Sequence, residues 1–163
     1  MLKRYAAAAL VRDHSVLLCL RAAQRSSYPS VWDFPGGHIE PEELPPTAVR
    51  REIMEELGVT ITLSEPPLHL VYREIDAEMY LWRIVEWDGN IQNNALDEHD
   101  ELRWCGMTEI ATLKLAHPAY IQLIAGLLDP QQERPSLPRL LADDVAPAHS
   151  SSTLSHNGGP VRL

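Results

Sequence analysis

The sequence has little cysteine, and its two cysteines, Cys19 and Cys105, have no spacing typical of a disulfide framework or a metal-binding pair. Isolated cysteines of this kind are typical of a reducing compartment, so we expect a cytoplasmic protein. Cys19 lies within an apolar run, and we expect its thiol to be buried as a small hydrophobic group.

Long apolar runs are also missing. The run at residues 5–11 follows Lys3 and Arg4 and is ended by Arg12 and Asp13. It is too short for an export signal or a membrane span, so we expect no membrane partner.

Positive charge is scarce as well, with 14 lysine and arginine residues against 23 aspartate and glutamate residues and a formal net charge of −9. Proteins that bind nucleic-acid polymers carry a basic stripe, so this balance argues against that class. The length of 163 residues and the apolar content of 45% predict one globular domain with a single core.

Glutamate is concentrated in residues 37–59. Residues 46–57 predict a helix, because Pro46 suits the first turn and Gly58 suits the left-handed residue after the last turn. Leu44 precedes two prolines and should be extended. The helix should bury an apolar stripe made by Ala48, Val49, Ile53 and Leu57.

Three glutamates of this helix, Glu52, Glu55 and Glu56, lie at i, i+3 and i+4 and therefore on one face. Like charges at this spacing destabilise a helix by a few tenths of a kcal/mol. A divalent cation such as Mg²⁺ or Mn²⁺ reverses that effect, since both ions prefer carboxylate oxygens. The alternative is a solvated acidic face.

The spacing is more specific than the charge. The pattern G-x5-E-x7-R-E-U-x-E-E-x-G-U, with U a bulky apolar residue, is matched by Gly37, Glu43, Arg51, Glu52, Ile53, Glu55, Glu56, Gly58 and Val59. This segment resembles the Nudix box, the signature of the Nudix (MutT-type) hydrolases. Residues 32–37, WDFPGG, are similar to the W-x-F-P-G-G lead-in common in that family. The resemblance covers residues 5–128 as a fold.

The resemblance implies an α/β protein with the Nudix fold, in which a mixed β-sheet is sandwiched between helices (α/β/α). We expect this domain to occupy residues 1–129, followed at 130–163 by a Pro/Ser/Gly-rich tail that is weakly ordered. Outside the helix described above, local patterns predict strands at 5–11, 15–20, 59–63, 68–75, 78–87 and 102–105 and helices at 108–113 and 118–128. The last helix should face inward with Ile121, Ile124, Leu127 and Leu128.

The resemblance also implies a metal site. Its ligands would be the carbonyl oxygen of Gly36 and the carboxylates of Glu52, Glu55, Glu56 and Glu98, with Glu98 chosen because it lies a few residues ahead of Trp104. Glu101 is the alternative to Glu98, and an acidic surface loop at 97–101 is the simpler interpretation. Catalytic roles fall to Glu52, Glu55 and Glu98, and either Glu52 or Glu98 would accept the proton of the attacking water.

Further roles are expected for residues around the box. Arg21 matches the place of a phosphate-binding arginine, although Arg25 could serve as well and a surface arginine ending a strand is equally consistent. Arg51 is expected to orient its neighbours by pairing with Glu55 or with Glu43, and Gly37 and Gly58 are expected to be structural.

Base recognition is less constrained. His117 stands where relatives that read oxidised guanine often have asparagine or aspartate, so it is either a base contact or a plain N-cap or surface histidine. Tyr72, Tyr80 and Trp82 either stack on a base or belong to the core.

The resemblance thus implies an enzyme, a Mg²⁺- or Mn²⁺-dependent pyrophosphohydrolase acting on a small-molecule nucleotide. The short chain favours a nucleoside triphosphate, intact or damaged, cleaved to a nucleoside monophosphate and pyrophosphate. ADP-ribose or a nucleotide sugar is the alternative substrate, and a nucleotide-sensing module without catalysis is the second alternative. Monomers and homodimers both occur among such proteins.

Overall fold

Strand β1 (Lys3–Arg12) is the centre of the sheet in the computed structural model, which describes residues 1–129. The tail expected at 130–163 lies outside the described residues. Inside β1 every side chain from Ala6 to Leu10 is almost completely buried. Alternate residues of the strand pack against different core clusters on its two faces. Small alanine side chains let the layers on both faces approach closely.

The remaining strands pair around β1. They are β2 (Ser15–Arg21), β3 (Trp32–Asp33), β4 (Gly36–His38), β5 (Thr60–Ile61), β6 (Leu68–Tyr72), β7 (Ala77–Ile84), β8 (Trp87–Asp88) and β9 (His99–Cys105). The main sheet has the order β3-β2-β1-β7-β6, with β4 also paired to β1 and β9 also paired to β2. The β1–β7 pair is parallel and its neighbours are antiparallel, so the sheet is mixed, as predicted. Strands β5 and β8 form a separate pair.

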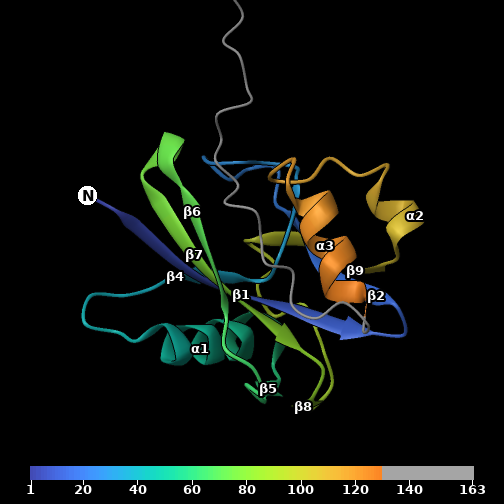
Figure 1. Cartoon of the computed structure of the whole chain (residues 1–163), viewed down its shortest axis with the longest axis horizontal. Helices are drawn as coiled ribbons and strands as arrows, with labels where there is room; N and C mark the ends of the chain where they lie inside the picture. The colour runs from blue at the N-terminus through green and yellow to red at the C-terminus, as the bar shows by residue number, and fades with distance from the viewer. Residues whose placement is uncertain (130–163) are drawn as a thin grey trace, which may run out of the picture.

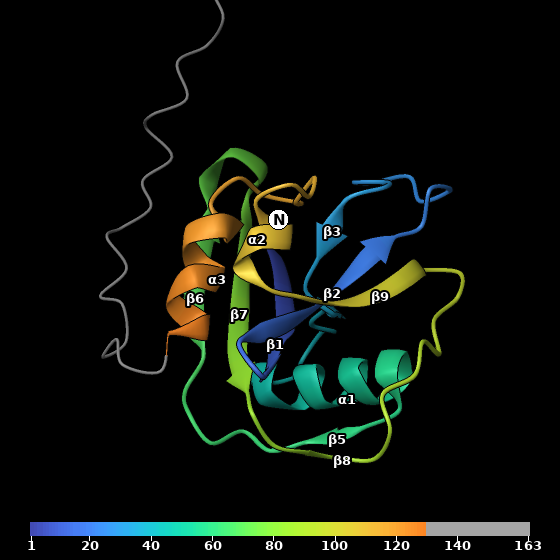
Figure 2. The same cartoon turned by 90° about the vertical axis from the view of Figure 1, so that its right-hand side faces the viewer.

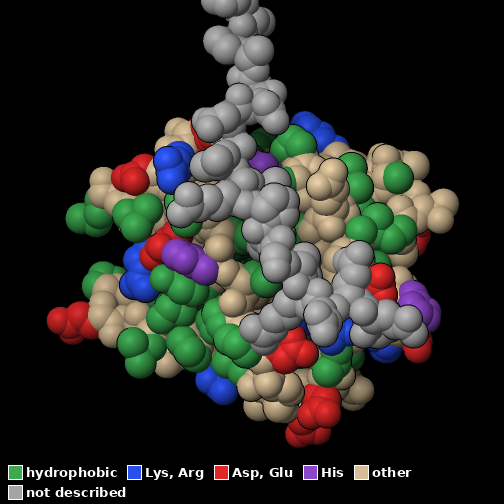
Figure 3. All heavy atoms as spheres, viewed as in Figure 1, with side chains coloured by type: hydrophobic (Ala, Val, Ile, Leu, Met, Phe, Trp, Pro, Cys, Tyr) green, Lys and Arg blue, Asp and Glu red, His purple; other side chains and the backbone are tan. Residues whose placement is uncertain are grey.

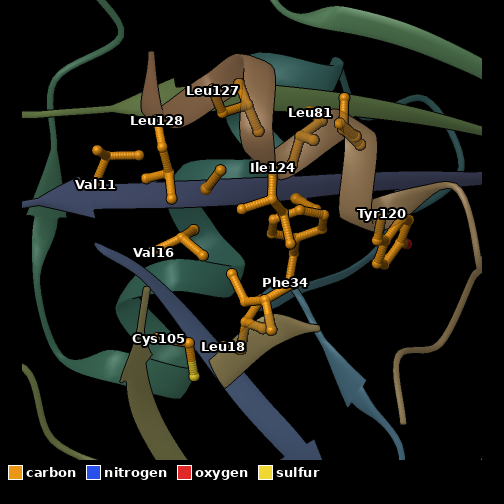
Figure 4. Packing of buried hydrophobic residues seen from close by; sticks show 14 of the residues in the cluster. Val11, Val16, Leu18, Phe34, Leu81, Cys105, Tyr120, Ile124, Leu127 and Leu128 are labelled. Atoms are coloured by element: carbon orange, nitrogen blue, oxygen red, sulfur yellow. The ribbon is translucent and has the colours of Figure 1, made fainter. Parts of the chain in front are cut away.

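Helices cover both faces of the sheet (Figures 1 and 2). The helical segments are α1 (Pro45–Leu57), the 3-10 turn η1 (Arg73–Ile75), α2 (Met107–Ile110) and α3 (Tyr120–Leu128). Helix α1 packs on one face, and α3 packs on the other over the cluster shown in Figure 4. The predicted α/β/α sandwich is therefore confirmed.

Helix α1 has the predicted form and begins one residue earlier than expected. Leu44 is extended, with φ −86° and ψ 143°. Gly58 is left-handed, with φ 71°, and its N–H donates to the carbonyl of Met54. The predicted stripe is fully buried, at 0% exposure for Ala48, Val49, Ile53 and Leu57.

Helix α3 corrects one prediction. Ile121 was expected to face inward but is 39% exposed, whereas Tyr120 and Leu123 are buried. The helix begins at Tyr120, so the inward positions are 120, 123, 124, 127 and 128, which follow the helical repeat from that residue. Ile121 falls outside this stripe.

Other boundaries differ by a few residues. The strand predicted at 59–63 is reduced to β5 (Thr60–Ile61), and β9 begins at His99, inside the acidic run. Trp82 is buried in the cluster beneath α1, so it belongs to the core and not to a base site. Tyr80 stacks on His69 with ring centroids 4.6 Å apart.

On the face of Figure 3, outside the grey atoms, acidic and basic side chains are interspersed and no basic stripe is visible. No helix within residues 1–129 is long and apolar enough to cross a membrane.

Candidate active site

A cavity of about 520 Å³ is lined by several of the predicted site residues. One part of its wall, which we call the acidic part, is formed by Gly36, Gly37, Arg51, Glu52, Glu98 and His99. Another part, which we call the aromatic part, is formed by Asp33, Phe34, Tyr72, His117 and Tyr120. Arg21 and Arg25 line the same cavity.

A second hollow, of about 650 Å³, lies elsewhere and contains no residue of the box. Its Trp104 is stacked on Trp87, and the Arg12 guanidinium lies 4.1 Å from the centre of the Trp104 ring. Because protein groups already occupy this aromatic surface, we take the first cavity as the candidate active site.

Glu52 lies against the glycine loop. A Cβ atom on Gly37 would come within 2.5 Å of the Glu52 carboxylate, so the absence of a side chain at Gly37 makes room for it. Arg51 donates to Glu52 Oε1 at 2.8 Å. Burial raises the pKa of Glu52, and the negative charges of Glu55 and Glu98 add to the rise against the opposing effect of Arg51.

Glu56 lies deeper than the other two glutamates and is 3% exposed. Its Oε2 accepts a hydrogen bond of 2.9 Å from the N–H of Gly36, and its Oε1 lies 3.6 Å from His99 Nε2. Burial raises the pKa of Glu56 to about 9, with contributions from the charges of Glu52 and Glu98. The three box glutamates thus share a helix face but differ in depth.

Glu55 and Glu98 are the more exposed carboxylates. The Glu55 side chain is 60% exposed, does not line the cavity and accepts a hydrogen bond of 3.3 Å from Arg51. Glu98 lines the cavity and pairs with Arg25. Glu101, the alternative to Glu98, pairs instead with Arg103 on β9 and faces the second hollow. This geometry favours Glu98 over Glu101.

The chemistry of the acidic part fits a divalent cation. Its carboxylates and the Gly36 carbonyl offer oxygen ligands, which hard cations such as Mg²⁺ and Mn²⁺ prefer. Burial and, to a smaller extent, repulsion from neighbouring carboxylates raise the pKa values of Glu52 and Glu56, and a bound cation relieves such repulsion. As the side chains of residues 1–129 stand, no three potential ligands are close enough to hold a cation. Arg51 and Arg25 now pair with these carboxylates.

Arg51 makes both contacts suggested by the sequence. It binds Glu43 through two hydrogen bonds of 2.9 Å and also contacts Glu55. A third anchor is the carbonyl of His38, 3.1 Å from Arg51 Nη2. The hydrogen bonds from Arg51 lower the pKa of Glu43 to about 2. Arg51 therefore ties the loop before α1 to the helix.

Arg21 is positioned by the loop that follows β2. Its guanidinium donates to the carbonyls of Ser27 and Tyr28, each at 3.1 Å, and lies 3.9 Å from Asp33. Arg21 thus lines the cavity and also holds the loop. Arg25, which the sequence left as an alternative, reaches the same cavity.

The aromatic part includes two residues that the sequence reasoning missed, Asp33 and Tyr120. The Tyr120 hydroxyl donates to Asp33 Oδ1 at 3.3 Å, and the Phe34 and Tyr120 rings lie 4.9 Å apart. Burial raises the pKa of Asp33. A signal was present, since Asp33 is a carboxylate between two aromatic residues in the lead-in to the box.

His117 lies just before α3 and lines the cavity. Its Nδ1 accepts a hydrogen bond of 3.1 Å from the N–H of Ala119, just before α3. The same ring lines the cavity and makes an edge contact with Tyr72, with centroids 5.2 Å apart. The helix start therefore fixes His117 at the cavity wall.

Comparison with known proteins gives consistent matches. The family model described as NUDIX domain matches residues 2–127. The CTP pyrophosphohydrolase of Escherichia coli (strain K12) is 34% identical over 133 residues, which are 80% of this chain and 94% of that protein. The nucleoside triphosphatase NudI of Escherichia coli O1:K1 is 45% identical over 53 residues, which are 32% of this chain and 38% of that protein.

Solved structures show the same fold. The solution structure of the E. coli ORF135 protein has a TM-score of 0.65 at 29% identity and covers 83% of this chain and 94% of that one. The MutT NUDIX hydrolase from Burkholderia pseudomallei has a TM-score of 0.60 at 23% identity, covering 76% of this chain and 95% of that one, a likeness of fold alone.

Proposed function

The chain belongs to the Nudix family, and from this membership we propose that it hydrolyses nucleoside triphosphates, with Mg²⁺, to a nucleoside monophosphate and pyrophosphate. The observation that carries the proposal is the 34% identity to a CTP pyrophosphohydrolase across 94% of that protein. A cytidine triphosphate is accordingly the first substrate to test. Damaged nucleoside triphosphates come next.

The acidic part of the cavity supplies the residues that would hold the cation. They are the carbonyl oxygen of Gly36 and the carboxylates of Glu52 and Glu98. Glu55 and Glu56, which stand on the same helix face just outside the cavity lining, would complete the ligand set. Bound Mg²⁺ would offset phosphate charge and lower the pKa of a coordinated water. Because Arg51 and Arg25 now neutralise several of these carboxylates, cation binding would exchange those ion pairs for metal contacts and free Arg25 to meet a phosphate.

Two carboxylates are candidates for accepting the proton of the attacking water. Glu52 is partly buried and has a raised pKa, which brings it closer to the operating pH of a general base. Glu98 stands across the same cavity and is more exposed. The base is identified by comparing pH–rate profiles of Glu52→Gln and Glu98→Gln, since the profile of the variant lacking the base loses its acidic limb.

The aromatic part would receive the base. Tyr72 and His117 offer ring surfaces beside the polar pair of Asp33 and Tyr120. Aromatic faces bind any nucleobase by stacking, and polar groups among them select one base over another. This arrangement suits a nucleotide whose phosphates lie toward Glu52 and Glu98.

The test is a substrate panel compared by kcat/KM, with Mg²⁺ and with chelator. It contains CTP, dCTP, the other nucleoside triphosphates, oxidised nucleotides, ADP-ribose and nucleotide sugars, and products are resolved as pyrophosphate or orthophosphate. We expect Mg²⁺-dependent release of pyrophosphate from a nucleoside triphosphate. A preference for ADP-ribose or a nucleotide sugar overturns the substrate, and equal, negligible turnover by the wild type and by Glu55→Gln leaves only a binding module.

A further inference from the structure

The core of the described chain contains two buried side chains that are charged or polar, Glu56 at 3% exposure and His99 at 4%. They face each other, with His99 Nε2 3.6 Å from Glu56 Oε1. Burying two such groups is unfavourable unless they are well paired, and apolar residues of similar volume are often at least as stable. The pair is therefore poorly explained by stability alone.

A β-bulge aims His99 at Glu56. Strand β9 pairs residue by residue with β2 from Cys105 to Glu101, and then the register shifts so that Arg21 pairs with His99. Leu102 packs on the α1 side of the sheet, and strict alternation from Leu102 would turn His99 to the opposite side. The extra residue, Asp100, reverses this, as bulges beside active sites commonly do.

The backbone holds the two residues at a fixed separation. The His99 N–H donates to the carbonyl of Ala95, and the His99 carbonyl accepts from the Asn93 side chain, each at 2.8 Å. The next residue of that loop, Asn94, donates its N–H to the Glu56 carbonyl at 2.8 Å. The start of β9 and the end of α1 are thus joined through a single loop.

The contacts of Glu56 leave lone pairs with which its carboxylate could bind a cation. Oε2 is held by the N–H of Gly36 and Oε1 faces His99, while each carboxylate oxygen has a second lone pair. Ligating carboxylates are commonly held by such outer contacts. At 3.6 Å the His99 contact is longer than a hydrogen bond, and contacts of this kind tighten when the ligand binds.

We propose that His99 is a positioning residue for the metal site, whose Nε2–H holds Glu56 in the orientation in which its carboxylate binds the divalent cation. This inference rests on the proposed function, because it takes Glu56 as a ligand. His99 acts through Glu56 and does not touch the substrate phosphates. The bulge at Asp100 is the structural device that makes the contact possible.

The test measures Mn²⁺ affinity by electron paramagnetic resonance, without substrate. His99→Leu removes the donor at similar bulk, whereas His99→Gln places an amide N–H near the position of Nε2. We expect the dissociation constant for Mn²⁺ to rise roughly 10–100-fold in His99→Leu and to return to within about threefold of wild type in His99→Gln. His69→Leu removes another histidine–glutamate contact, His69–Glu78 at 2.8 Å, in which neither residue lines the cavity. This control should leave the dissociation constant for Mn²⁺ unchanged.

The outcomes separate this inference from the proposed function. If the wild type itself binds no Mn²⁺, the metal site fails and the role of His99 fails with it. If the wild type binds and His99→Leu binds equally well, only the positioning role is overturned. Equal losses in the Leu and Gln proteins also overturn it, because a purely structural role predicts no rescue. If His99→Leu melts below the assay temperature, His99→Asn is used in its place. A His99→Asn protein that binds Mn²⁺ as tightly as the wild type overturns the proposal.

Discussion

The acidic and aromatic parts of the cavity are built in different ways. The acidic part comes almost entirely from one continuous segment, residues 36–56, completed by Glu98 and His99, and its contacts are short ion pairs and hydrogen bonds. The aromatic part gathers single residues from β3, β6, the turn before α3 and α3 itself, joined mainly by ring contacts. The residues proposed for the reaction chemistry thus lie in a local motif, whereas those proposed for base selection are brought together by tertiary packing.

The largest effect is expected from a substitution that disrupts only the acidic part. Glu52→Gln keeps the size of the side chain and removes its charge, and kcat/KM should fall by about 10³-fold, since cation-assisted stabilisation contributes several kcal/mol. Steady-state kinetics with nucleoside triphosphates of two different bases checks this, and the ratio of kcat/KM between the two substrates should not change. Glu42→Gln, an exposed glutamate of the same segment, is the matched control. A changed base ratio in Glu52→Gln would contradict the separation of the two parts.

A second test contrasts two adjacent glycines. In Gly37→Ala the new Cβ meets only the end of the Glu52 side chain, so the protein should fold while kcat falls by about 10²-fold, because misplacing a reacting group by an ångström has that effect. In Gly36→Ala the Cβ meets the Ala6 carbonyl oxygen at 2.3 Å, and φ is +142°. Unfolding free energy should therefore drop by about 2 kcal/mol or more.

Thermal melting and kinetics measured side by side distinguish the two glycine variants. An active Gly37→Ala protein would show that Glu52 need not occupy its observed place. A Gly36→Ala protein as stable as the wild type would show that the β4 backbone adjusts without strain.

The aromatic part is tested by His117→Ala. Loss of the ring should reduce discrimination between the preferred base and others by about tenfold, within the range that pocket contacts provide, with Mn²⁺ affinity unchanged. Competition assays between two nucleoside triphosphates measure this ratio. His69→Ala serves as the control for a histidine outside the cavity. An equal loss of kcat/KM for every base would indicate that His117 supports the acidic part or the fold and does not select the base.

The smallest effect concerns the support of the acidic part. The hydrogen bonds from Arg51 hold the pKa of Glu43 at about 2, below its ordinary value of 4.5. A carboxylate with a lowered pKa stabilises the folded state above its ordinary pKa, and this contribution is lost as the pH falls through the folded value. The difference in melting temperature between wild type and Glu43→Gln should therefore be constant near neutrality and shrink between pH 4.5 and 2. A difference independent of pH would contradict this linkage.

The sequence predicted the acidic part better than the aromatic part for a physical reason. Helix α1, its glycine end and its buried stripe depend on local backbone preference and periodicity, which single residues express directly. The start of α3 depends on Tyr120, which packs on Phe34 and bonds to Asp33 across a long separation. That contact cannot be found from periodicity, and the exposed position of Ile121 follows from it.

The different burial of Glu52 and Glu56 could likewise not be predicted from the local sequence. The spacing of Glu52 and Glu56 gives a shared face, but only the crossing of β4 over α1 buries Glu56 beneath Gly36. His99 required the bulge in β9, which alternation of polar and apolar residues does not reveal.

The parallel pairing of β1 with β7 has a consequence for how the molecule is made. Lys3 aligns with Ala77 and Leu10 with Ile84, so one edge of the middle strand is paired only with residues synthesised more than seventy positions later, whereas β2 and β4 on its other side are made early. Distant pairings of this kind slow folding. While the ribosome is still translating the intervening residues, α1 has strands β1 to β4 to pack against, but the contact between Glu56 and His99 forms only after the start of β9 has emerged.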